Sequence, residues 1–89
     1  MKAVVTVVGK DQVGIIAGVC NLLAEYNVNV LDISQTVMQG YFTMMMVVDV
    51  SQSAIALDQL CQKMEDAGKE KKLSIRVQRE DIFEAMHRV

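Results

Sequence analysis

The 89-residue sequence contains no proline, no tryptophan, one histidine and two cysteines. Without proline, the breaks between helices and strands fall to glycine, asparagine and serine. A metal site would need further histidine or cysteine ligands near His87, and none is close in the sequence. A nucleophile and its base would have to combine His87 with Cys20 or Cys61, which both lie on apolar helical patterns. We therefore expect no metal site, no cofactor and no enzymatic activity.

The chain also lacks an excess of positive charge, because nine Lys and Arg residues against eleven Asp and Glu residues give a net charge of −2. This balance argues against direct binding to nucleic acids or to anionic membranes. No apolar run approaches the ~20 residues of a membrane span, and residues 1–9 are too short for a secretory signal. We expect a cytoplasmic protein whose cysteines stay reduced, although two cysteines are also enough for one disulfide.

What the chain has in quantity is apolar residues, at 52% of the sequence. This share predicts a folded globule, and the length predicts one domain. Seven methionines against four aromatic residues indicate an adaptable core or an interface that can repack.

Four segments have the character of β-strands. Residues 3–8 and 41–50 are apolar at both odd and even positions, which is typical of central strands covered on both faces. Residues 28–39 and 73–79 alternate between apolar and polar side chains, as half-exposed edge strands do.

Two helices are predicted between these strands. The first has an apolar face from Ile15 to Tyr26, and Asn27 suits the left-handed residue that ends a helix. The second follows a cap at Ser51 or Ser53, and we expect it to end at Gly68.

The element order is therefore β-α-β-β-α-β, and residues 81–89 form a further, C-terminal amphipathic helix. Right-handed crossovers then give an antiparallel sheet of order 4-1-3-2 with both long helices on one face. The topology places the two doubly apolar strands in the centre, which agrees with their composition. We predict an α+β, ferredoxin-like sandwich.

One face of this sheet lacks a cover. We expect its apolar surface to come from the following residues of the two central strands: Val5, Val7, Thr43, Met45 and Val47. Exposed apolar patches of this size usually mark an interface. The C-terminal helix or a second subunit must cover the face, so we expect a homodimer or a higher homo-oligomer in which this helix packs on its own domain or on a partner subunit.

The segment GKDQVGIIAGVC, residues 9–20, interrupts this regular pattern. We interpret Gly9 as the end of the strand and Asp11 as a helix N-cap, which places residues 12–14 in the first helical turn. The free backbone N–H groups of such a turn attract carboxylate or phosphate groups. Gly14 would allow close approach of a ligand or another backbone. In the alternative, purely structural interpretation, Gly14 packs against the sheet.

The stretch KDQVGIIAGVCNLLAEYNVNVLDI resembles the signature of the ACT domain family, a small regulatory module of amino-acid metabolism. In that signature Asp-x-x-Gly and two aliphatic residues open a helix, and Asn with an aliphatic residue opens the next strand. The matching positions are Asp11, Gly14, Ile15, Ile16, Asn29 and Val30. The resemblance implies an ACT domain over residues 1–80. The motifs VVGKDQVGI, NVLDISQTVM, FTMMM and IFEAMHRV are similar to small stand-alone bacterial ACT proteins related to the glycine cleavage system transcriptional repressor.

This resemblance implies a regulatory site for an amino acid or related metabolite at a subunit interface. The site would lie between the turn before the first helix in one subunit and the start of the second strand in its neighbour. The residues implied to bind the effector are Gly9, Lys10, Asp11, Gln12, Val13, Gly14, Ile15 and Asn29. Gln12-Val13 replaces the family's common Arg-Pro, and Gly9 replaces a histidine of some serine-binding relatives, so the identity of the effector stays open.

Three other functions share the fold. A sensor would pass its state to a protein partner in a regulatory pathway, whereas an ACT domain can also serve only as an assembly scaffold. An acyl-phosphate hydrolase would need an arginine in the loop after the first strand, where this chain has only Lys10. An RNA-binding domain would need a basic residue and more aromatic residues around GYFTMMM, where Gln39 and methionines stand instead.

Overall fold

A computed structural model describes residues 1–86 of the chain. Its elements are β1 (Lys2–Lys10), α1 (Ile15–Glu25), β2 (Asn29–Met38), β3 (Tyr41–Asp49), α2 (Leu57–Lys71), β4 (Leu73–Arg79) and α3 (Glu80–Met86). The four antiparallel strands are ordered β2-β3-β1-β4, which is the predicted 4-1-3-2 order read from the other edge. The ferredoxin-like fold is confirmed. Residues 87–89, including His87, lie outside the described part.

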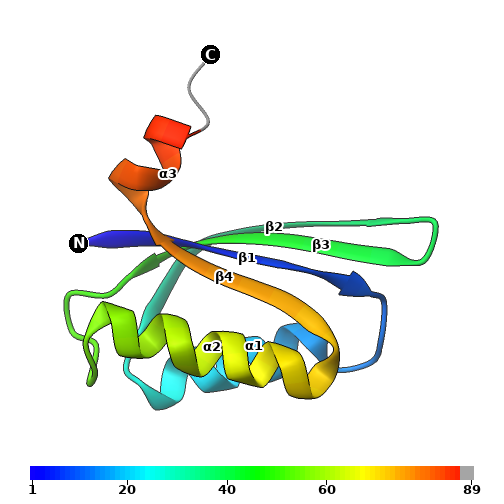
Figure 1. Cartoon of the computed structure of the whole chain (residues 1–89), viewed down its shortest axis with the longest axis horizontal. Helices are drawn as coiled ribbons and strands as arrows, with labels where there is room; N and C mark the ends of the chain where they lie inside the picture. The colour runs from blue at the N-terminus through cyan, green and yellow to red at the C-terminus, as the bar shows by residue number, and fades with distance from the viewer. Residues whose placement is uncertain (87–89) are drawn as a thin grey trace.

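Both long helices lie on one side of the sheet and α3 rises from the other side (Figure 1). The core fills the space between the sheet and these two helices. Its largest fully buried side chains are Val5, Val7, Leu23, Met44, Met46, Val48, Leu60 and Met64. Three of the seven methionines therefore pack in the core. Among residues 1–86, no helix combines the length and apolar character that crossing a membrane requires.

The prediction for the open face of the sheet was wrong in one strand. Val5 and Val7 point toward the helices and are fully buried. The row of β1 on the open face consists instead of Val4, Thr6 and Val8, which pair with Val47, Met45 and Thr43 of β3. Because both rows of β1 are apolar, hydrophobicity alone did not say which row faces the helices.

The end of α1 is as predicted. Asn27 adopts a left-handed conformation with φ of 61°. The Asn27 and Val28 N–H groups donate to the carbonyl oxygens of Ala24 and Leu23 at 3.0 and 2.9 Å, which closes a Schellman motif. The Asn27 side chain also donates to the Gln52 carbonyl oxygen at 2.9 Å and ties this turn to the loop before α2.

Neither predicted boundary of α2 is correct. The N-cap residue is Ala56, whose N–H donates to the Gln59 side chain at 3.2 Å, so Ser51 and Ser53 lie in the preceding loop. The helix continues past Gly68 to Lys71 and ends at Lys72, which has a positive φ of 59°. Gly68 is buried against β4, and a Cβ atom there would lie 2.7 Å from the Leu73 carbonyl oxygen. Glycine is needed at this position for close packing, and not to end the helix.

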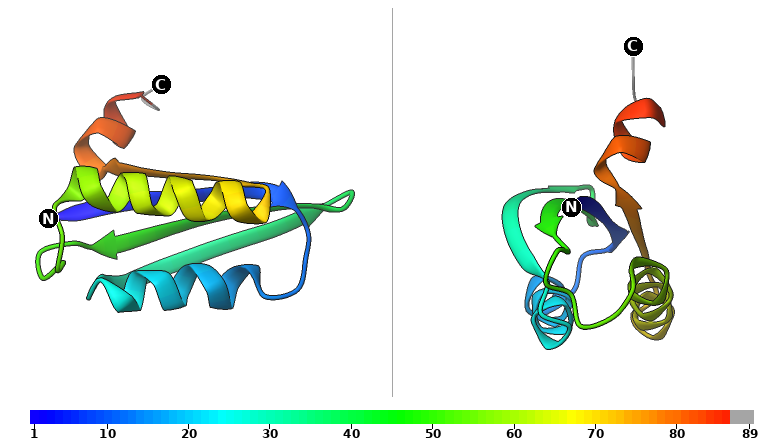
Figure 2. Two further views of the ribbon diagram at one scale, coloured as in Figure 1. Left: turned by 60° about the horizontal axis from the view of Figure 1, so that its bottom comes forward. Right: turned by 90° about the vertical axis from the view of Figure 1, so that its left-hand side faces the viewer.

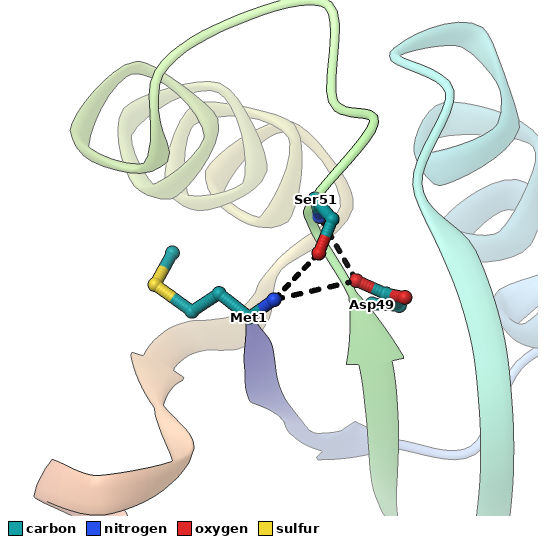
Figure 3. A network of polar contacts seen from close by, with 3 residues as sticks. All are labelled: Met1, Asp49 and Ser51. Atoms are coloured by element: carbon teal, nitrogen blue, oxygen red, sulfur yellow. Dashed lines mark hydrogen bonds and ion pairs between the residues drawn. The ribbon is translucent and has the colours of Figure 1, made fainter.

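Ser51 instead joins two strand ends (Figure 3). Its hydroxyl accepts a hydrogen bond from the Met1 ammonium group, and its N–H donates to Asp49 at 2.9 Å. The Met1 nitrogen lies 3.7 Å from the same carboxylate. The hydrogen bonds from Ser51 and the nearby ammonium group lower the pKa of Asp49 below its ordinary value. The carboxylate therefore keeps these contacts until the pH falls through that lowered pKa.

The two helical glycines give a matched test of packing. Gly68→Ala should lower the free energy of unfolding by about 1–2 kcal/mol, because the clash with backbone exceeds the gain in helix propensity of up to ~1 kcal/mol. Gly18→Ala should be neutral or stabilising, because its new Cβ meets only the mobile end of the Lys71 side chain. Urea unfolding of both variants measures the difference, and equal effects would contradict the account of Gly68.

Candidate functional site

The β1–α1 loop, residues 11–14, is anchored to the turn between β2 and β3. The Asp11 N–H donates to the Gly40 carbonyl oxygen at 2.8 Å. Gly9 does not end the strand as predicted, since β1 continues through Lys10. In the sheet Gly9 pairs with Phe42 and Leu73, and a side chain on it would collide with the Leu73 side chain. Gly9 is thus a packing residue within the sheet.

The helix start also differs from the prediction. Gly14 is the N-cap residue of α1, and no side chain caps the helix, so Asp11 is not the cap and residues 12–14 precede the first turn. Gly14 has φ of 86°, a left-handed conformation that glycine adopts without the steric cost of a side chain. No atom lies within 4 Å of the position that a Cβ would take. The alternative interpretation, in which Gly14 packs against the sheet, is therefore wrong, and the space over Gly14 is open.

A shallow pocket of about 280 Å³ lies at this end of α1. It is lined by Asp11, Gln12, Gly14, Ile15, Ile16, Ala17 and Phe42. The first backbone N–H groups of a helix have no partner within the helix, and here no side chain supplies one. The pocket thus combines free helix amides, one carboxylate and apolar walls.

The structure brings together only part of the predicted set. Of the eight residues, Asp11, Gln12, Gly14 and Ile15 line the pocket. Val13 is fully exposed beside it, while Gly9 and Lys10 belong to β1. Phe42 was missed, because it is distant in sequence and only the register of β1 with β3 places it opposite Gly9.

The Gln12 side chain already has a partner in the fold. Its amide group donates to the Lys71 carbonyl oxygen at 3.1 Å, so it links the loop to the last residue of α2. This tertiary contact is enough to explain why a polar residue stands at position 12. Asp11 is then the one ionisable side chain among the residues that line the pocket.

Asn29 lies at the opposite end of the sheet. It opens β2 and pairs with Asp49, whereas Asp11 is bonded beside Tyr41 at the other end of β3. Eight residue steps of strand separate these positions, which corresponds to ~27 Å. Asp11 and Asn29 of one chain therefore cannot contact the same small molecule.

Among residues 1–86, no group of three or more His, Cys, Asp or Glu side chains is arranged to hold a metal ion. The two cysteines are half-buried and unpaired with each other. The Cys61 thiol donates to the Val77 carbonyl oxygen at 3.2 Å, and burial is the main cause that raises its pKa. A thiol with a raised pKa is a poor nucleophile at neutral pH.

Comparison with known proteins identifies relatives over the whole chain. Residues 2–78 match the ACT domain family. The sequence is 53% identical over all 89 residues to a UPF0237 protein of Listeria innocua, with both chains fully covered. An ACT domain protein from Streptococcus pneumoniae has a similar structure, with a TM-score of 0.83, 47% identity and 98% of both chains covered.

A candidate glycine cleavage system transcriptional repressor has a TM-score of 0.74 at 22% identity. The match covers 88% of this chain and 44% of that one, so at this identity it shows a shared fold. The structural similarity to this repressor and to the Streptococcus pneumoniae protein agrees with the resemblance found in the sequence.

The backbone requirement at Gly14 can be tested without a ligand. Gly14→Val should lower the free energy of unfolding by about 1–3 kcal/mol, because a β-branched residue is strained at this φ. Gly14→Asn should cost clearly less, because asparagine tolerates the left-handed region. Chemical denaturation of both variants gives the comparison. Equal losses for Val and Asn would show that added bulk, and not the backbone conformation, is what the site rejects.

Proposed function

The chain belongs to the ACT domain family, and from that membership we propose that it is a regulatory module that binds an amino acid or a related small metabolite between two subunits. The observation that carries this proposal is the open pocket at the uncapped N-terminus of α1, which is built by the motif residues Asp11, Gly14 and Ile15.

The chemistry of the pocket fits an amino acid. The free N–H groups at the start of α1 attract a carboxylate, and the helix dipole adds to this attraction. The Asp11 carboxylate can accept hydrogen bonds from an ammonium group. Phe42, Ile16 and Ala17 then offer apolar contact to the rest of the ligand. With only one ionisable side chain, the pocket has no acid–base pair, which favours binding over catalysis.

The distance between Asp11 and Asn29 supports a site shared by two subunits. The two edge strands of the sheet are β2 and β4, and β2, with ten residues against seven, is the longer edge. Exposed edges pair readily with another strand. Two β2 strands that pair antiparallel about a two-fold axis near their middle would bring the partner's Asn29 beside Met38. That end of β2 leads into the turn where Gly40 holds Asp11.

A second candidate function is an assembly scaffold without a ligand. One observation favours it: the Gln12 side chain is bonded to Lys71, and neither Lys10 nor Val13 lines the pocket. The pocket thus offers fewer polar side chains than the motif alone predicts. The proposal also includes a protein partner, which rests on the family, and a cytoplasmic location, which rests on the composition.

Ligand binding is tested by thermal unfolding in the presence of each amino acid. A specific ligand at 100 times its dissociation constant adds ~2.7 kcal/mol of stability, which shifts the melting temperature by several degrees. If no amino acid and no related metabolite shifts the transition, the scaffold function holds and the effector site is wrong.

A double-mutant cycle tests the two polar residues with the ligand so identified. Asp11→Ala and Asn29→Ala should each weaken binding by ~1–3 kcal/mol, because each leaves a ligand group without its partner. The double variant should lose less than the sum, since both residues hold one molecule. Asn21→Ala, an exposed asparagine on α1, is the control. Calorimetric titration measures all four, and strictly additive losses would contradict a shared ligand.

A further inference from the structure

The two long helices leave a groove between them. α1 and α2 lie side by side on one face of the sheet and run in opposite directions, so the start of α1 lies beside the end of α2 (Figure 2). A hollow of about 210 Å³ lies between the two helices, and Ile75 of β4 closes it toward the sheet. None of the residues that line it also lines the pocket with Asp11 and Gly14. The groove is therefore a separate site.

Most of the lining of this groove is apolar. Val19 and Leu22 of α1, Ala67 of α2 and Ile75 contribute it. Val19 and Ile75 are 2% and 4% exposed, so the groove reaches down to the core. An apolar cavity of ~150 Å³ can hold benzene, so this groove has room for an apolar group of about six carbon atoms.

Gly18 leaves space in the groove for the Lys71 side chain. A Cβ atom on Gly18 would collide with the Lys71 ammonium group, so this group lies directly against the backbone of α1. The Lys71 carbonyl oxygen accepts the hydrogen bond from the Gln12 side chain at 3.1 Å. The backbone that carries the ammonium group is thereby held beside the start of α1.

The charges in the groove have no partner in the fold. Residues 1–86 contain two ion pairs, and neither includes Lys71 or Glu70, the second charged residue of the lining. An ammonium group donates strong hydrogen bonds to a carboxylate, and apolar walls favour a ligand that takes apolar surface out of water. The groove therefore complements a molecule with a carboxylate at one end and an apolar group at the other.

We propose that the groove between α1 and α2 is a further small-molecule site, which binds a carboxylate with an apolar body of about six carbon atoms. The Lys71 ammonium group donates to the carboxylate, while Val19, Leu22 and Ile75 contact the apolar body. This site lies within one chain and needs no partner subunit, so it is independent of the effector site proposed above.

Glu70 distinguishes two sources of such a carboxylate. Free aliphatic acids and apolar amino acids share the groups that Lys71 and the apolar lining recognise. The Glu70 carboxylate repels a free acid but can accept hydrogen bonds from the ammonium group of an amino acid. Glu70→Gln should therefore strengthen the binding of a free acid and weaken that of an amino acid. A preference for the amino acid that this variant reverses identifies the amino acid as the ligand, and a preference for the free acid that it increases identifies the free acid.

Three matched probes test the site: leucine, 4-methylpentanoate, which lacks the amino group, and 3-methylbutylamine, which lacks the carboxylate. NMR chemical shifts of the backbone amides report both where each probe binds and how tightly. Ligands this small should have dissociation constants of about 1 mM. We expect the Gly18 and Lys71 amides to shift with at least one of the two acids and not with the amine. Asp11→Ala should leave these shifts unchanged, so failure of the effector site and failure of the groove give different results.

Two variants remove the recognition of the carboxylate. Lys71→Met keeps the apolar stem without the charge and should raise the dissociation constant about fivefold or more. Gly18→Ala should do the same, because its Cβ displaces the ammonium group from the groove while the chain stays folded. Lys63→Met removes an exposed charge of α2 outside the groove and should bind like the wild type.

Three results would overturn the proposal. The first is that neither acid shifts the Gly18 and Lys71 amides. The second is that the amine binds better than both acids, because Lys71 would then not be the group that attracts the ligand. The third is that Lys71→Met and Gly18→Ala bind the acid as tightly as Lys63→Met does.

Discussion

The backbone hydrogen bond between the Asp11 N–H and the Gly40 carbonyl oxygen determines where the candidate site can be. It joins the loop before α1 to the turn between β2 and β3, which are far apart in sequence but meet where the end of β1 pairs with the start of β3. Gly14 then turns the chain into α1 with a positive φ. These two constraints leave the start of the helix uncapped and hold the Asp11 carboxylate next to it. They also place the pocket at the end of β2 that an antiparallel partner strand would bring close to its own Asn29.

The sheet order was predictable because strands covered on both faces and strands exposed on one face differ in amino-acid composition. The two strands that are apolar at both odd and even positions are central, and the two that alternate are edges. The orientation of a doubly apolar strand was not predictable, because Val4 and Val5 are equally apolar and only the packing of the helices decides between them.

The candidate site was predictable in its position and less so in its details. Asp11 and Gly14 were identified from spacing, but an aspartate three residues before a glycine fits both a side-chain cap and a loop that ends in a left-handed glycine. Gly68 shows the same ambiguity, because a glycine that ends a helix and a glycine that admits a neighbouring strand look alike in one sequence. The hydrogen bond from Gln12 to Lys71 could not be predicted, because the two residues are 59 positions apart and no local sequence pattern indicates the contact.

The described residues leave two surfaces without a partner, the edge of β2 and the open face, and the proposed function requires that the pocket be completed between two subunits. Subunit mixing tests this central claim most directly. Asp11→Ala chains mixed with Asn29→Ala chains form mixed dimers in which one of the two sites has both native residues, so a shared site predicts one site of native affinity per mixed dimer by calorimetric titration. If the mixture binds no more tightly than either variant alone, Asp11 and Asn29 do not meet across a subunit boundary and the account is wrong.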